Sequence, residues 1–217
     1  MSKKMLIALA TIVVVRIFLF INFNADDWRI PLMIFVTVLG VFFINRIIKN
    51  SQFLYPAIII LVLAVNGFYK PFEFGFNNNP VPVWITDEQR REHGLNYDSP
   101  GVLVIHNKVV NYAFSFLEHY FDYFRGDFLF TNGTFLYFFD ILFIGVGFWM
   151  IIKSPKGWKP IIIWLFAAPI SAALNFQPPT SLKAANMLIP LTVISSFGAL
   201  KLMSLILKMG KGVKYKI

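Results

Sequence analysis

The residues best suited to chemistry in this sequence are ionisable side chains that interrupt apolar stretches, namely Arg16, Asp140 and Lys201. A charge at membrane depth is costly, so such residues pair with one another, face a cavity or serve a function. Lys201 is close enough to the end of its stretch for its ammonium to reach the membrane surface. Arg16 is expected near mid-membrane, where two interpretations stay open: a structural pair with an acid or a carbonyl, or a functional role.

Asp140 is the sixth residue of an apolar stretch that begins at Phe135. Six residues of helix correspond to about 9 Å, so we expect water in a cavity to reach this carboxylate. Two further carboxylates, Asp26 and Asp27, follow the first apolar stretch. Paired carboxylates at a membrane surface can supply a general base or bind a divalent ion. The shortness of the loop favours the other interpretation, a polar turn with solvated acids.

The three histidines do not form a metal-binding pattern. Glu118 and Asp122 lie beside His119, but a spacing such as HExxH is absent around it and around His93 and His106. The chain has no cysteine, which excludes disulfides, thiolate zinc sites and cysteine nucleophiles. We therefore predict neither a metal site nor a bound cofactor.

Composition points to a membrane protein. Of 217 residues, 57% are hydrophobic and 14% are charged, whereas soluble domains carry about 25% charged residues. The net charge of +9 does not indicate a nucleic-acid partner, because the basic residues flank apolar stretches. The basic N-terminus lacks a small-residue cleavage site and predicts a retained helix. We expect an integral protein of the cytoplasmic membrane, with the lipid bilayer as its first partner.

Six apolar stretches approach the roughly 20 residues that a helix needs to cross a bilayer core. They predict an all-α integral membrane protein with three transmembrane helices in 1–69, an extracytoplasmic loop in 70–134, and three transmembrane helices with a basic cytoplasmic tail in 135–217. Lysines and arginines gather at one set of helix ends and in the C-terminal tail, which predicts that both termini are cytoplasmic. The six stretches are 5–23, 31–48, 53–69, 135–152, 160–174 and 184–207.

The long loop is expected to hold two helices. Its first part, 70–84, is rich in proline and asparagine, which favour turns and extended backbone. A short helix follows, with Thr86 as N-cap, Gln89 in the capping-box position and Gly94 as its stop. From Val109 onward, apolar residues recur at helical spacing, which predicts an amphipathic helix at the outer membrane surface.

Lys183 is the best candidate for binding an anion. It follows the prolines of "PPTSLKAANMLIP" and falls in the first turn of the last apolar helix. A cation is slightly unfavourable there by itself, but a lysine and a helix N-terminus attract the same phosphate. Anchoring at the lipid headgroups is the alternative.

Two stretches resemble the membrane glycosyltransferases of the GT-C type that use polyprenyl-phosphate sugars, in the branch of the protein O-mannosyltransferases and lipid A aminoarabinose transferases. One is "HNK" at 106–108 with "YFDYFRGDFLFTNG" at 120–133, and the other is "APISAALNFQPPTSLKAANMLIP" at 168–190. The resemblance covers the second half of the chain, and the first three apolar stretches match only by hydropathy.

The resemblance implies sugar transfer from a polyprenyl-phosphate donor to an acceptor on the outer face. Donor transfer needs cations to hold the phosphate, for which Lys183 comes first, followed by Lys108 and Arg125. Trp84 and His106 are candidates for acceptor contact or for a lid over the site. Family members commonly have arginine at the position of Lys183, so a point charge replaces a bidentate contact here.

The catalytic acid of the family lies in the first outer loop of an N-terminal half, and the stretches recognised here belong to the C-terminal half. Asp26 and Asp27 are only weak substitutes for it. The chain is therefore expected to be the C-terminal part of a transferase, or a subunit whose partner carries the catalytic half. The alternatives are a non-catalytic scaffold that stabilises a partner membrane protein and, on the basis of Arg16 and Asp140 alone, a small transporter.

Overall fold

The computed structural model describes residues 3–23, 28–69, 80–132, 136–176 and 178–212. Every regular element in these ranges is a helix, as the sequence predicts. Two segments, Arg29–Ile47 and Ala184–Leu207, are long and apolar enough to span a membrane. Three other apolar helical segments are too short by the same criterion. Among the described helices, length and composition therefore identify two candidate spans rather than the six predicted. The shorter ones are Met5–Leu19, Gln52–Gly67 and Lys159–Ala173.

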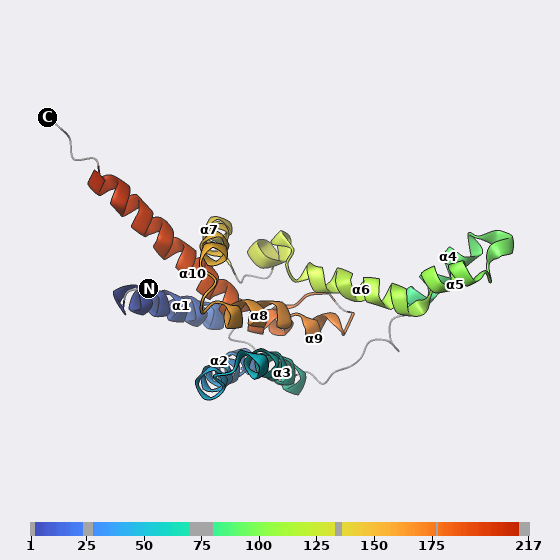
Figure 1. Cartoon of the computed structure of the whole chain (residues 1–217), viewed down its shortest axis with the longest axis horizontal. Coiled ribbons are helices and arrows are strands. Elements are labelled where there is room, and N and C mark those ends of the chain that lie inside the picture. The colour runs from blue at the N-terminus through green and yellow to red at the C-terminus, as the bar shows by residue number, and fades with distance from the viewer. Residues whose placement is uncertain (1–2, 24–27, 70–79, 133–135, 177, 213–217) are drawn as a thin grey trace.

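The last helix, α10 (Ser181–Gly212), is the centre of the bundle. Its side chains from 184 to 198 are buried, except that Val193 is half-buried. A helix buried all round needs neighbours on every side. Figure 1 shows the first half of α10 among the other helices, while its C-terminal half projects away from them. The helix contacts α1 (Lys3–Phe23), α2 (Arg29–Ile47), α3 (Ser51–Tyr69), α7 (Asp140–Lys153) and α8 (Lys159–Ala167).

Two glycines allow α7 and α10 to cross almost backbone to backbone. A Cβ added to Gly198 of α10 would lie 1.9 Å from the carbonyl oxygen of Phe143 in α7. A Cβ added to Gly147 of α7 would lie 2.4 Å from the carbonyl oxygen of Ile194 in α10. Small residues permit this approach between helices in membranes, where packing replaces the hydrophobic effect as the main attraction. The α7–α10 contact is therefore fixed by the absence of two side chains.

The structure corrects two predicted helices. The stretch 135–152 was expected to be helical throughout, but α7 begins only at Asp140. The stretch 160–174 divides into α8 and the one-turn α9 (Ile170–Ala173), with Pro169 as the N-cap of α9. Proline has no N–H to continue the hydrogen-bond ladder, so the break between α8 and α9 falls at Pro169.

The segment 80–132 forms an arm that leaves the bundle (Figure 1). It comprises α4 (Val81–Arg91), a 3-10 turn η2 (Gly94–Asn96), α5 (Pro100–Ile105), α6 (Lys108–Asp122) and a π-helical turn η3 (Phe128–Asn132). The predicted amphipathic helix is confirmed as α6, capped by Asn107, whose Oδ1 accepts a hydrogen bond from the N–H of Val110 at 2.9 Å. The α6 helix packs against α9 and carries α4 near its other end.

The start of α4 differs from the prediction. Thr86 was expected to be the N-cap, but the N-cap is Pro80, six residues earlier, and Pro82 lies in the first turn. Proline fits this position because the first N–H groups of a helix have no intrahelical partner. Thr86 is instead buried, and its hydroxyl donates to the carbonyl oxygen of Pro82 at 2.7 Å. The expected extended segment 70–84 therefore becomes helical from 81 on, and 70–79 lies outside the described residues.

The glycine crossing leads to a first prediction. Gly198→Ala places a methyl group inside the van der Waals radius of a backbone oxygen, so we expect the substitution to cost about 3 kcal/mol or more of unfolding free energy. Gly145→Ala is the matched control on α7, since no heavy atom lies within 4 Å of its added Cβ, and it should be neutral or slightly stabilising. Equilibrium unfolding in detergent measures both. Equal effects of the two substitutions would contradict the close crossing.

Candidate functional site

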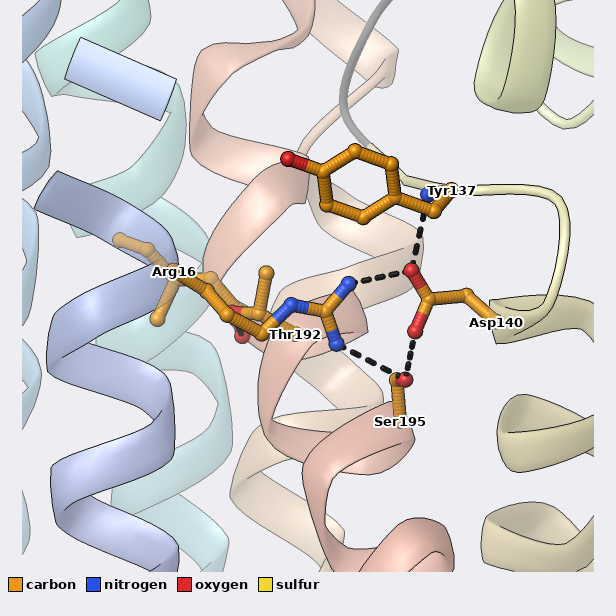
Figure 2. Close-up of polar contacts among 6 residues, drawn as sticks. Arg16, Tyr137, Asp140, Thr192 and Ser195 are labelled. Carbon is orange, nitrogen blue, oxygen red and sulfur yellow. Dashed lines mark hydrogen bonds and ion pairs between the residues drawn. The ribbon is translucent and has the colours of Figure 1, made fainter. Parts of the chain in front are cut away.

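Two of the residues singled out in the sequence, Arg16 and Asp140, form an ion pair across the bundle. Figure 2 shows an Nη atom of Arg16 on α1 bonded to Oδ2 of Asp140 on α7. The other Nη of Arg16 donates to the hydroxyl oxygen of Ser195 on α10 at 2.9 Å, and that hydroxyl donates to Oδ1 of Asp140. Three helices are thereby joined through one closed set of charged and polar groups.

The position of Asp140 differs from the sequence expectation in depth and environment. It is the first residue of α7, and the backbone N–H of Tyr137 donates to its Oδ2 at 2.8 Å. A carboxylate at a helix N-terminus is favoured by the helix dipole. The side chain is fully buried. The expectation that water in a cavity reaches this carboxylate is therefore wrong. Of the two interpretations of Arg16, the structural pair with an acid is the one that the geometry realises.

A second polar network, which sequence reasoning missed, crosses the core between four helices. The Nδ2 of Asn66 on α3 donates to the hydroxyl oxygen of Ser171 on α9 at 2.9 Å and to the carbonyl oxygen of Ala168 at 3.0 Å. Asn186 on α10 donates from Nδ2 to Oδ1 of Asn66, and its own Oδ1 lies 2.8 Å from the hydroxyl oxygen of Thr37 on α2. Amides within apolar stretches were the available signal, because a buried amide needs hydrogen-bond partners.

A pocket of about 270 Å³, here called the arginine pocket, lies where the end of α6 meets the chain just before α10. Arg125 donates from Nη1 to Oδ1 of Asp122 at 3.3 Å and from Nη2 to Oδ2 of Asp127 at 3.2 Å. These bonds raise the pKa of the guanidinium, the Asp122 bond most, and the group stays charged. The lining residues are His119, Asp122, Arg125, Asp127, Phe128, Pro178 and Pro179.

Aromatic contacts fix the end of α6 that carries this pocket. The hydroxyl of Tyr120 donates to the carbonyl oxygen of Phe166 at the end of α8, at 2.8 Å, and the Phe124 and Phe166 rings lie 5.8 Å apart. Tyr123 is fully buried against Phe128 of the pocket wall. Burial, and secondarily the charge of Asp122, raise the pKa of the Tyr123 hydroxyl well above its usual value. The arginine pocket is therefore supported by packed aromatic side chains that carry no charge.

The structure separates Lys108 from Arg125 among the three predicted donor-binding cations. Arg125 lies in the arginine pocket, and Lys183 is in the first turn of α10, four residues after Pro179 of the pocket wall. The Lys183 side chain lies outside the described set. Lys108 begins α6, and the 14 steps along the helix to Asp122 correspond to about 21 Å. Lys108 therefore does not share a phosphate site with Arg125, which corrects the grouping made from sequence.

Trp84 and His106 lie at the same far end of the arm as Lys108. Arg90 of α4 donates from Nε to the carbonyl oxygen of His106 at 2.7 Å, and Nδ1 of His106 lies 3.2 Å from Oε1 of Gln89. Trp84 is 63% exposed on α4. His106 is therefore held by α4, and neither residue lines the arginine pocket.

The remaining candidates are placed as follows. Asp26 and Asp27 lie outside the described residues. Among the described residues no group of three or more His, Asp or Glu side chains could hold a metal ion. The Nζ of Lys201 lies 5.5 Å from the centre of the Phe197 ring, near the end of the bundle where α7 ends.

Comparison with known proteins gives no relative for this chain: no family model, no curated protein and no solved structure matches it.

The ion pair leads to a second prediction. Arg16→Met and Asp140→Asn should each cost about 3–5 kcal/mol of unfolding free energy, because each leaves a buried partner uncompensated. The double variant should cost clearly less than the sum, since the interaction is lost only once. Equilibrium unfolding in detergent measures the cycle. Lys201→Met is the matched control, a basic residue of the same bundle with no ion pair among the described residues, and it should change stability little. Additive effects of the two substitutions would contradict a direct pair.

Proposed function

We propose that this chain is the C-terminal part or a subunit of a membrane glycosyltransferase that moves a sugar from a polyprenyl-phosphate donor to an extracytoplasmic acceptor. The observation that carries the proposal is the arginine pocket, which joins the two stretches that resemble GT-C transferases. Arg125, Asp127 and Phe128 come from the first stretch, and Pro178 and Pro179 come from the second. Phe128 and Pro178 are 50 residues apart in sequence, and both contribute walls to one pocket.

The donor phosphate is bound by Arg125 and Lys183 in this proposal. A guanidinium carries five N–H donors, and Asp122 and Asp127 each take one from Arg125. Three donors are left for phosphate oxygens, and the two carboxylates fix the direction of the group. These carboxylates also repel a phosphate, so the proposal requires the positive charge of Lys183 in addition to that of Arg125.

The proposal includes six membrane-crossing segments with both termini cytoplasmic. The bundle supports it through the apolar side chains on its outer faces, such as Phe18 on α1, Phe42 on α2 and Trp149 on α7, each more than half exposed. A bilayer is the environment in which such a surface is stable. Residues of α1, α7, α8 and α10, together with Lys156 and Lys201, also line one common pocket that shares no residue with the arginine pocket.

The second candidate is a non-catalytic subunit that stabilises a partner membrane protein. The exposed apolar residues of the arm favour it, with Val104, Val109 and Phe114 each more than 60% exposed. The two candidates differ in one respect. A scaffold holds its partner with or without donor lipid, whereas a donor-binding subunit responds to the lipid itself.

Donor binding by the purified full chain in detergent tests the proposal. Arg125→Ala and Lys183→Ala should each weaken the binding of a polyprenyl phosphate roughly tenfold or more, the size expected for one charge-assisted hydrogen bond. Lys108→Ala is the matched control, an exposed lysine at the other end of α6, and should leave the dissociation constant unchanged. A polyprenol without phosphate should bind weakly to every variant. Unchanged affinity in both pocket variants, or an equal loss in Lys108→Ala, would overturn the proposal.

A further inference from the structure

A second pocket, here called the lysine pocket, has a volume of about 430 Å³ and lies at the end of α7 opposite the capping turn of Asp140. Four helices meet there: the start of α1, the end of α7, the start of α8 and the C-terminal half of α10. Its volume falls in the range of about 300–1,000 Å³ typical of small-ligand sites. Its apolar lining includes Leu6, Leu9, Ile161 and Phe197.

The polar part of the lysine pocket is basic. Lys156 is exposed in the turn between α7 and α8, and Lys201 is half-buried beside the Phe197 ring. Among the described residues that line the pocket none is acidic, and Ser154 is the remaining polar side chain. Two ammonium groups therefore face one apolar cavity without a carboxylate to neutralise them.

An adjacent pocket extends the apolar surface. Trp158 lines both pockets, and on its other side a cavity of about 440 Å³ lies between α7 and α8, with a wholly apolar lining surface. Phe148, Ile151 and Ile162 are among its walls, and Lys159 lies at its edge. A pocket with two lysines in its lining therefore adjoins an apolar pocket, with Trp158 shared between them.

We infer that the lysine pocket binds an anionic phospholipid, with the headgroup phosphate at Lys156 and Lys201 and an acyl chain along the apolar walls around Trp158. Basic pockets between membrane helices on the cytoplasmic side select anionic headgroups. An acidic peptide would pair with the two lysines but would make no apolar contact with the walls. Free phosphate would pair with the lysines and leave both apolar cavities unfilled. The inference does not depend on the sugar-transfer proposal, because it concerns the other end of the bundle.

Lipid binding to the purified full chain in detergent tests this inference. Native mass spectrometry during titration with dioleoyl-phosphatidylglycerol and dioleoyl-phosphatidylcholine counts the lipids that remain bound. The wild-type chain should retain one phosphatidylglycerol more tightly than phosphatidylcholine. Lys156→Ala and Lys201→Ala should each weaken retention about fivefold, the effect of roughly one surface charge on an anionic lipid. Both variants should keep their helical content and elution volume, since neither lysine makes an ion pair among the described residues.

Lys49→Ala is the matched control, because Lys49 is an exposed lysine just after α2 and does not line the pocket. It should leave the preference for phosphatidylglycerol unchanged. An equal loss in Lys49→Ala would mean general surface attraction and would overturn the site. Displacement of the lipid by millimolar inorganic phosphate or by an oligoglutamate peptide would also overturn it, because the apolar walls would then contribute nothing.

Discussion

The bundle depends on the buried pair of Arg16 and Asp140, closed by the hydroxyl of Ser195. Burying a charged group costs several kcal/mol of free energy unless its partners are in place. Each of the two residues is therefore stable in the core only when α1, α7 and α10 are packed together. The pair fixes the height of α1 against α7 and α10. The glycine crossing of α7 and α10 then sets how close these two helices lie. Together the ion pair and the glycine crossing prevent α1, α7 and α10 from sliding along one another. A core of leucine and isoleucine alone would not fix these positions.

This constraint separates two ends with different chemistry. The capping turn of Asp140 stands near one end of α7, and the lysine pocket lies at the other end, where α7 finishes. The arginine pocket is built from the end of α6 and the prolines before α10. Each pocket has basic side chains in its lining, Arg125 in the first and Lys156 with Lys201 in the second. The arginine pocket holds two carboxylates beside its cation, whereas the described lining of the lysine pocket holds none, so the two should select different anionic ligands.

Much of the helical content could be predicted from the sequence, because periodic apolar stretches leave few alternatives. The second stretch, 31–48, agrees with α2 within two residues at each end. The start of α7 could not be placed by hydropathy, since the aromatic run before Asp140 is as apolar in a turn as in a helix. The aspartate itself was the usable signal, given its preference for helix N-termini. Likewise Pro82 marked the first turn of α4 better than Thr86 did.

The pairings across the bundle lay beyond sequence reasoning. Arg16 and Asp140 are 124 residues apart, and nothing in their local sequence distinguishes this pair from contacts with a carbonyl or with lipid. Asn66 and Asn186 show the same limit, with 120 residues between them. The joining of Arg125 to the proline turn before α10 is also a property of the packed chain. Sequence identified the cations, and packing decided which of them share a pocket.

We propose that the arginine pocket and the lysine pocket lie on opposite sides of a membrane. Because the chain has no cysteine, single cysteines can be introduced without background: Glu118→Cys on the exposed surface of α6 and Ser154→Cys at the lysine pocket. Sealed cells or vesicles of known orientation are treated with a membrane-impermeant maleimide before and after permeabilisation. We predict that Glu118→Cys reacts from the outside and that Ser154→Cys reacts only after permeabilisation. Labelling of both cysteines from the same side would contradict the claim.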